Sequence, residues 1–308
     1  MADLKLFTVS DGFTVEIPSG GFALERQLQE LLEKNMSDVI GVRFLASEYA
    51  TGRLHAGRID SLGLDENGAP VIVEYKRTSN DNVINQGLFY LDWLLDHRAE
   101  FQLLVAEKLG DEIAATIDWR APRLLCIARD FNRYDEHAVR QIDRNVELIR
   151  YRTFGESLLA IELVTSVVAQ PRDNPQPQKK TASASRSPSS QTKVSRLLSR
   201  ADDQLSSLYR QFETFALGLG DDVVKNERDN YFAFRRLKNF ACVEIHPSSR
   251  NLLIYLKVSP DLVALEEGFS RDVRNLGHFG TGDLELRVAD STRWATLEEL
   301  TQRAYDAS

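Results

Sequence analysis

The chain has 308 residues, of which 43% are hydrophobic and 27% charged, and its formal net charge is −8. This length predicts about two domains, and the composition is typical of a globular protein. No segment approaches the ~18 consecutive apolar residues of a membrane helix, which argues against a channel or membrane transporter. The N-terminus lacks the basic start and apolar stretch of a signal peptide, so we expect a cytoplasmic protein.

The cysteines and the charge distribution limit the function further. Cys126 and Cys242 lie far apart in apolar segments, which excludes a disulfide framework and a Cys/His zinc site. Residues 1–168 carry a net charge of −9, residues 169–200 of +6 and residues 201–308 of −5. This balance argues against a protein that wraps DNA, and it leaves open an enzyme with a local basic patch.

The domain organisation follows from one segment of unusual composition. Residues 169–200 begin with a stretch rich in Pro, Ser, Gln and Lys that has almost no large apolar residues. Such a segment cannot build a core, so we expect a flexible basic linker between a domain at 1–168 and a smaller domain at 201–308. The same charge could instead attract nucleic acid weakly.

The first domain reads as an α/β sheet with helices on its faces. Its start alternates like a hairpin, and leucines at helical spacing follow. The predicted elements are a hairpin over 4–17, a helix over 23–35, extended segments over 39–49, 55–65 and 70–77, a long helix over 81–110, a strand over 122–131, a helix over 135–143, and strands over 146–154 and 157–165.

The second domain reads as a small α+β fold. Its predicted elements are a helix over 202–220, strands within 231–247 and 251–259, a helix from Pro260, a strand over 282–290 and a final helix over 296–308. The Gly-rich segment 277–283 lacks the Lys-Ser/Thr pair of a phosphate loop, so we expect a connecting turn there.

The residues that carry chemistry lie between Asp60 and Lys76. Glu74 and Lys76 are two apart on a predicted strand, so their side chains project from one face. Pairing across the Asp-Glu-Asn-Gly turn would bring Asp60 beside Glu74. Two carboxylates suit Mg²⁺ or Mn²⁺, with the backbone carbonyl of Tyr75 as a further ligand. Lys76 would orient the attacking water or stabilise charge on a phosphate. A solvated strand face is the alternative.

The segment GRIDSLGLDENGAPVIVEYKR resembles the active-site hairpin of the PD-(D/E)XK nuclease superfamily, in its NucS/EndoMS and RecB-type branch. Two further matches lie outside the hairpin. Glu25 stands on the first helix, where that branch carries an acidic residue that reaches the metal, and Gln86 and Tyr90 form a Q-x-x-x-Y pattern after the Lys strand. The resemblance covers residues 20–168 and implies a restriction-endonuclease-like mixed sheet flanked by helices.

The whole chain looks more closely like a bacterial family of NucS-like proteins that join this domain to a C-terminal domain of unknown function. Some members carry the description "predicted transport protein", which the absence of an apolar span does not favour. About 20 residues precede the first helix, whereas NucS mismatch endonucleases have a substantial N-terminal DNA-binding and dimerisation domain. Mismatch specificity is therefore not implied.

Several other residues have a functional and a structural interpretation. Glu25 is a metal ligand or a surface Glu of a helix. Gln86 orients Lys76 or contacts substrate, or is a buried amide. The remaining candidates for substrate contact in the first domain are Glu48, Arg58, Arg77 and Tyr90, with charge balance or core packing as the alternatives. We interpret His55 as a loop residue and Trp93 as a core aromatic.

The second domain offers one candidate patch. Arg235, Arg236 and Lys238 are interleaved with aromatic residues, a pattern that suits nucleic-acid phosphates and bases. Because strand alternation buries half of such side chains, the aromatics are more simply core residues.

We therefore expect a Mg²⁺- or Mn²⁺-dependent DNA endonuclease or exonuclease. The alternatives are a non-catalytic nucleic-acid or protein-binding module on a nuclease fold, and a defence nuclease that awaits an activator. Single-stranded, branched, mismatched and modified DNA all stay open as substrates. A homodimer would suit paired cuts.

Overall fold

The computed structural model describes residues 4–52, 56–76, 83–167 and 192–308. The chain divides into two compact units, Met1–Gln170 and Pro171–Ser308. Each unit has its own sheet and its own hydrophobic core, and each is described separately below.

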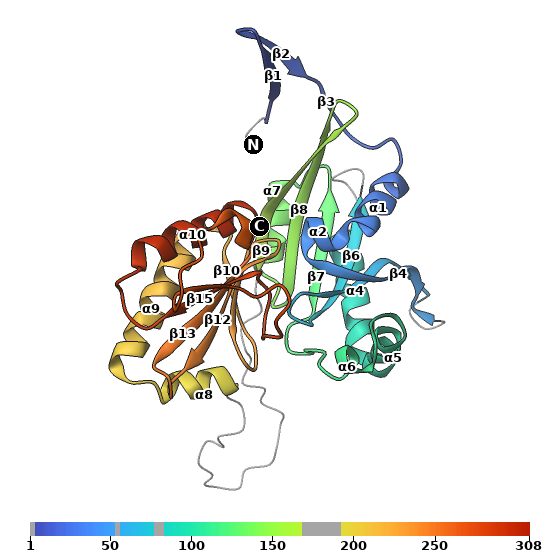
Figure 1. Ribbon diagram of the computed structural model, residues 1–308. Helices are drawn as coiled ribbons and strands as arrows, with labels where there is room; N and C mark the ends of the chain where they lie inside the picture. The colour runs from blue at the N-terminus through green and yellow to red at the C-terminus, as the bar shows by residue number, and fades with distance from the viewer. Residues whose placement is uncertain (1–3, 53–55, 77–82, 168–191) are drawn as a thin grey trace, which may run out of the picture. The chain divides into compact units, whose positions relative to one another are not determined.

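The N-terminal unit is built on a seven-stranded mixed sheet (Figure 1). The order is β3-β8-β7-β6-β5-β4, with β9 also paired to β8. The central strands β6, β7 and β8 are parallel, and the other pairs are antiparallel. The strands are β3 (Ser19–Gly20), β4 (Val42–Ala50), β5 (Arg58–Asp65), β6 (Pro70–Lys76), β7 (Arg123–Ala128), β8 (Asn145–Phe154) and β9 (Leu158–Val167).

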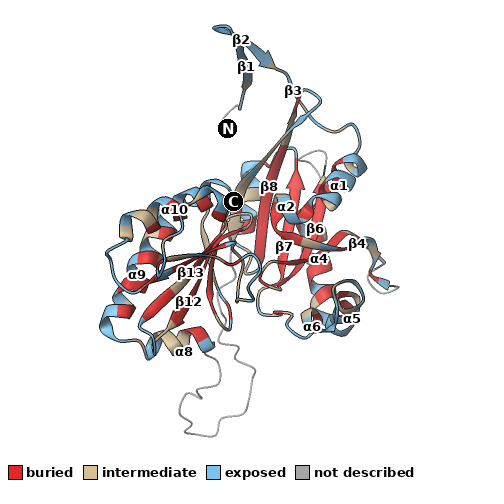
Figure 2. Ribbon diagram, in the orientation of Figure 1, coloured by how far each residue is buried: buried red, intermediate tan, exposed pale blue. Residues whose placement is uncertain are grey.

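Helices cover both faces of this sheet, so the central strands are buried (Figure 2). On one face, Gly87 lies so close to Leu124 that an added Cβ would stand 2.4 Å from its Cδ1. On the other face, the Ser61 hydroxyl donates to Glu33 of the first helix at 2.6 Å. The helices are α1 (Glu25–Lys34), α2 (Met36–Ile40), α4 (Val83–Asp96), α5 (Arg98–Leu109), α6 (Asp111–Ala114) and α7 (Arg133–Arg140).

The mixed sheet flanked by helices confirms the predicted fold class, with two local differences. The long helix predicted over 81–110 is broken at His97. The His97 ring stacks on Trp93 at 4.8 Å, and its Nδ1 lies 2.8 Å from the Trp93 carbonyl oxygen, so this side chain satisfies the end of α4. The extended segment predicted over 39–49 begins with the end of α2, and its strand starts at Val42.

A buried ion cluster closes the amino ends of the parallel strands. The Arg123 guanidinium donates two hydrogen bonds to Glu147, at 2.9 and 2.8 Å, and one to Asp65 at 3.0 Å. All three side chains are at most 3% exposed. Because Val71 pairs with Arg123 and Lys76 with Ala128, this cluster lies at the end of the strands opposite to Lys76.

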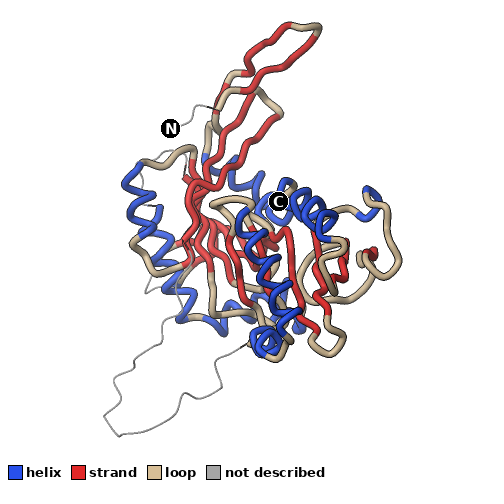
Figure 3. The backbone as a smooth tube through the Cα atoms, turned by 90° about the vertical axis from the view of Figure 1, so that its left-hand side faces the viewer, coloured by secondary structure: helices blue, strands red, loops and turns tan. Residues whose placement is uncertain are grey.

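The hairpin predicted at the start of the chain is present. β1 (Leu6–Ser10) and β2 (Phe13–Ile17) form a two-stranded sheet of their own (Figures 1 and 3). Its apolar side chains are largely exposed, Val9 by 74% and Phe13 by 75%.

The C-terminal unit is an antiparallel six-stranded sheet in the order β10-β11-β12-β13-β15-β14. The main core packs three helices against one side of the sheet, and a smaller cluster around Tyr255 and Cys242 lies apart from it. The elements are α8 (Lys193–Ser199), α9 (Asp203–Gly218), β10 (Val224–Glu227), β11 (Phe232–Arg235), β12 (Asn239–His246), β13 (Asn251–Leu256), β14 (Ser270–Asp272), β15 (Leu284–Val288) and α10 (Trp294–Asp306).

Two expectations for this region need correction. Within the linker predicted over 169–200, residues 193–199 form α8, because Thr192 caps its N-terminus and Val194 is fully buried. The helix predicted from Pro260 is wrong: only a single 3₁₀ turn forms, Pro260–Leu262. The rest of the predicted linker, 169–191, lies outside the described residues.

The described residues contain no helix that is long and apolar enough to span a membrane. Cys126 and Cys242 are both free and buried.

Candidate active site

Asp60 and Glu74 meet where β5 and β6 part. The ladder between these strands ends at the pair Ser61–Val73, and beyond it side chains replace backbone pairing. The Asp60 N–H donates to Glu74 Oε1 at 3.3 Å, and the Tyr75 N–H donates to Asp60 Oδ2 at 2.9 Å. The structure therefore brings the two carboxylates together, as the hairpin pattern predicts.

Glu74 is the carboxyl of this group whose surroundings most disfavour its charged form. Its side chain is 0% exposed, and its Oε2 is buried with no hydrogen-bond partner among the described residues. Burial, followed by repulsion from Asp60, raises the pKa of Glu74 to about 9. Burial also raises the pKa of the Asp60 carboxyl to about 6. Two such carboxylates side by side need a cation to hold both in the charged form.

Lys76 provides one positive charge at this place. Its ammonium lies 3.4 Å from Glu25 Oε1, and its side chain is only 13% exposed. Burial by itself lowers the pKa of Lys76, but the carboxylates around it outweigh burial, and the pKa is raised above its ordinary value. Glu25 therefore lies in contact with Lys76, and its role as a metal ligand stays a prediction.

Gln86 and Tyr90 reach the same end of the sheet from α4. The Gln86 amide donates to the Tyr90 hydroxyl at 3.3 Å, and this hydroxyl accepts from the Arg58 N–H at 3.1 Å. A Cβ on Gly57 would stand 2.5 Å from the Tyr90 ring, so glycine is required for this approach. Tyr90 is thus 5% exposed and fixes the start of β5 two residues before Asp60.

Gln29 is a site residue that the sequence analysis missed. Its amide nitrogen lies 2.9 Å from the Asp60 carbonyl oxygen, 3.1 Å from Ser47 Oγ and 3.0 Å from Glu33 Oε1. Gln29 is 7% exposed and thereby joins α1 to the main chain of Asp60. A polar residue directly after the buried Leu28, on the inner side of an amphipathic helix, is the signal that could have identified it.

The other predicted residues of this unit form an exposed ion pair, belong to the core, or lie outside the residues that the structure describes. Arg58 and Glu48 form an exposed ion pair at 3.2 Å, and Glu48 has a left-handed φ of 52°. Trp93 is a core residue, 1% exposed. Arg77 and His55 lie outside the described residues.

The predicted patch of the C-terminal unit is divided between different surroundings. Arg235 is 3% exposed and donates to the Arg236 carbonyl. The Arg236 guanidinium pairs with Asp222 at 2.6 Å and lies over the Tyr305 ring. Contact of these two arginines with nucleic acid stays a prediction. Lys238 lines a cavity.

The residues present fit a hard divalent cation. No group of three or more His, Cys, Asp or Glu side chains is arranged to hold a metal ion within residues 4–52, 56–76, 83–167 and 192–308. Mg²⁺, however, commonly binds through one or two carboxylates and otherwise water or phosphate oxygens. Asp60 and Glu74 provide such a pair, and the unpartnered Glu74 Oε2 is an oxygen that a cation would satisfy.

Comparisons with known proteins give the following matches. A family model described as a domain of unknown function, DUF5655, matches residues 194–308. An uncharacterized protein of Haemophilus influenzae is 27% identical over 299 residues, which cover 94% of this chain and 95% of the relative. A crystal structure of a repair endonuclease from Pyrococcus abyssi is similar at 18% identity and a TM-score of 0.28, over 42% of this chain and 47% of that one. A structure of an EndoMS–dsDNA complex is similar at 18% identity and a TM-score of 0.24, over the same shares, so the matched region spans under half of either solved chain.

Proposed function

We propose that this protein is a metal-dependent nuclease that hydrolyses phosphodiester bonds of DNA, with its active site at Asp60, Glu74 and Lys76. The observation that carries the proposal is the buried pair of carboxylates beside a lysine ammonium, in which one carboxylate oxygen has no hydrogen-bond partner among the described residues. DNA as the substrate rests on the resemblance of the hairpin segment to PD-(D/E)XK nucleases. We place the protein in the cytoplasm.

Each side chain then has a defined task. Asp60 and Glu74 would bind Mg²⁺ or Mn²⁺ together with the Tyr75 carbonyl. When bound, the ion would supply Lewis-acid activation of water and neutralise charge on the phosphate. Lys76 would present a positive charge to a phosphate oxygen or an attacking water, and its hydrogen bond to Glu25 would limit its movement.

The first test is cleavage of labelled single-stranded, duplex and branched DNA in Mg²⁺, Mn²⁺ or EDTA. We expect cleavage only with metal, and Asp60→Asn should lower the rate by about a hundredfold or more, since one ligand of the cation is lost. Asp92→Asn, an exposed carboxyl on α4, is the matched control and should cleave like the wild type. Equal rates for both variants would refute the assignment. DNA retention in a gel shift without any cleavage would favour the non-catalytic module.

Gln29 should act by positioning Asp60. In Gln29→Leu the Asp60 carbonyl loses its donor, so we expect Mg²⁺ affinity and cleavage rate to fall about 10- to 100-fold while the protein stays folded. Titration calorimetry with Mg²⁺ measures the affinity independently of turnover. Gln102→Leu, an exposed glutamine on α5, controls for the loss of an amide. Unchanged Mg²⁺ affinity in Gln29→Leu would show that this contact is not needed.

A further inference from the structure

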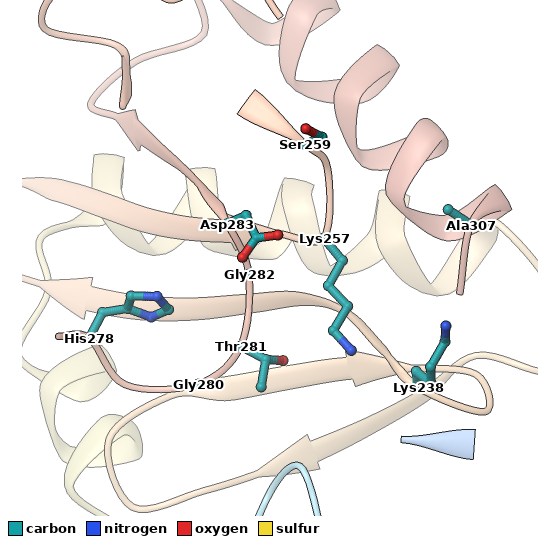
Figure 4. Close-up of a pocket in the computed structure, with 9 residues that line it drawn as sticks. All are labelled: Lys238, Lys257, Ser259, His278, Gly280, Thr281, Gly282, Asp283 and Ala307. Atoms are coloured by element: carbon teal, nitrogen blue, oxygen red, sulfur yellow. The ribbon is translucent and has the colours of Figure 1, made fainter. Parts of the chain in front are cut away.

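The C-terminal unit contains a cavity of about 490 Å³ that the proposed nuclease site does not use (Figure 4). Its walls come from the turn between β11 and β12, the end of β13 and the Gly-rich loop 277–283. Lys238, Lys257, His278, Thr281 and Asp283 line it with polar side chains. The cavity is therefore suited to a charged ligand rather than an apolar one.

Two lysines form part of the cavity wall. Residues 192–308 contain four lysines, and two of them, Lys238 and Lys257, line this cavity. Both are half-buried. In Figure 4 the Lys257 side chain extends across the cavity to end between Thr281 and Lys238. Two ammonium groups are thus placed around one small polar space.

The loop wall is held in place by the sheet. The Thr281 N–H donates to Cys242 Sγ at 3.4 Å, and the Asn239 amide donates to the Thr281 hydroxyl at 3.1 Å. The Asp283 N–H donates to the Leu256 carbonyl at 3.1 Å. The His278 ring stacks on Tyr255 with centroids 4.2 Å apart and planes within 7°. The cavity is consequently preorganised before any ligand enters.

Two glycines allow this close approach. Gly280 has a φ of +82°, and a Cβ there would stand 2.7 Å from the Cβ of Cys242. Gly282 has a φ of +146°, and a Cβ there would stand 2.8 Å from the Leu256 backbone nitrogen. Side chains are excluded at both positions, so the main chain of the loop itself forms the wall.

We propose that this cavity binds a phosphate group, as carried by inorganic phosphate, a nucleotide or a 5′-phosphorylated DNA end. Lysine binds phosphate as a point charge, and a glycine-rich main chain permits a close approach of the anion. The Thr281 hydroxyl adds a neutral donor. Among the described residues that line the cavity, Asp283 is the carboxylate and stands beside the two lysines. This site is independent of the proposed nuclease activity.

The test is titration calorimetry on the full-length protein in EDTA, which keeps divalent cations out of the candidate active site. The probes are inorganic phosphate, dAMP, and a short DNA oligonucleotide with and without a 5′ phosphate. We expect Lys238→Gln and Lys257→Gln each to weaken phosphate binding about tenfold. Lys193→Gln, the matched control, removes the same charge from α8 and should leave binding unchanged.

Asp283→Asn should change the affinity for phosphate in the opposite direction. Removing this negative charge should tighten binding of an anion about three- to tenfold. This variant keeps the proposal testable even if a lysine variant fails to fold, which a thermal melt would reveal. Preference for the 5′-phosphorylated oligonucleotide over its 5′-hydroxyl form and dAMP would support a DNA end as the source. Comparable affinities for dAMP and phosphate would support a small molecule.

The proposal is overturned by any of three results. One is that no probe binds at millimolar concentration, and another is that Lys193→Gln weakens binding as much as the cavity lysines do. The third is that Asp283→Asn weakens binding, which would assign the cavity to a cation or to none of these ligands.

Discussion

Glu74→Gln should abolish DNA cleavage and at the same time stabilise the metal-free protein. Loss of a cation ligand at the proposed active site is expected to lower the rate by about 10³-fold or more. The gain in stability arises because a neutral amide replaces a carboxyl group that is fully buried and has one oxygen without a hydrogen-bond partner in the described parts of the chain. Because the pKa of Glu74 is raised to about 9, folding at pH 8 forces this carboxyl to take up a proton, and removal of that cost is expected to add about 1–3 kcal/mol to the free energy of unfolding.

The pH dependence of folding stability follows from the raised pKa of Glu74. Burial and Asp60 raise the pKa of Glu74 to about 9, so between the unfolded value and pH 9 the folded state binds more protons than the unfolded state. The stability of the metal-free wild type should therefore fall as the pH rises from about 5 to 9. Glu74→Gln lacks this titration, and its stability should depend less on pH over the same range.

Thermal melting at pH 5, 7 and 9, with and without Mg²⁺, measures both effects. Mg²⁺ should raise the melting temperature of the wild type at pH 8 and leave Glu74→Gln nearly unchanged, since ligands stabilise only the state that binds them. Glu156→Gln, in the exposed turn before β9, is the control. A lower melting temperature for Glu74→Gln at pH 8, or retained cleavage, would contradict the proposed site.

Arg123→Met should destabilise the N-terminal unit by about 3–5 kcal/mol. The substitution removes the guanidinium that pairs with both Glu147 and Asp65 and leaves two carboxylates buried without a counter-charge. Burial alone would lower the pKa of Arg123, but the two carboxylates beside it outweigh burial and raise this pKa. The double variant Arg123→Met/Glu147→Gln should recover part of the loss, because one of the uncompensated charges is gone.

Amide hydrogen exchange during urea titration can report this change for each unit separately. Peptides from β7 and β8 should lose protection in Arg123→Met at lower urea, while peptides from residues 203–306 serve as an internal reference. Arg26→Met removes an arginine whose side chain is 83% exposed and should leave stability nearly unchanged. If Arg123→Met unfolds at the same urea concentration as the wild type, the ion cluster does not stabilise this unit.

The two predictions concern opposite ends of the same strands. At the amino ends, Arg123 matches the buried charge of Glu147 and Asp65, so the cluster is compensated. At the carboxyl ends, the ammonium of Lys76 faces a group of carboxylates that includes Glu25, and within the part of the chain that the structure describes Glu74 Oε2 has no hydrogen-bond partner. A buried carboxyl without a counter-charge lowers the stability of the protein without metal, and a strongly raised pKa of this kind is typical of functional sites.

Much of this arrangement could be predicted from the residue pattern alone. Alternating and continuous apolar segments predicted β5, β6, β7 and β8 in the order in which they occur. A two-residue spacing placed Glu74 and Lys76 on one face, and the hairpin turn predicted that Asp60 would lie nearby. These are local relations, and the period of a strand determines them before any tertiary contact forms.

Other features depended on contacts between distant residues. Gln29 reaches the Asp60 carbonyl across 31 positions, and no local pattern encodes that distance. Arg235 belongs to a strand that reads as basic, but the surrounding sheet and helices bury it to 3% exposure. The helix predicted from Pro260 was replaced by a single 3₁₀ turn, and the chain from there runs on to the short edge strand β14.

The distribution of buried charged residues shows most clearly what the local sequence determines and what the tertiary structure determines. From the sequence, Arg123, Glu147 and Asp65 are three ordinary charged residues spread over 82 positions, and Glu74 is one more acid on a strand. Only the packed sheet excludes water from all of them and pairs the three residues of the first group, whereas Glu74 Oε2 finds no hydrogen-bond partner among the residues described. Local periodicity thus determines where strands form and which way side chains point, whereas burial, and with it the pKa of each carboxyl, depends on the complete tertiary structure.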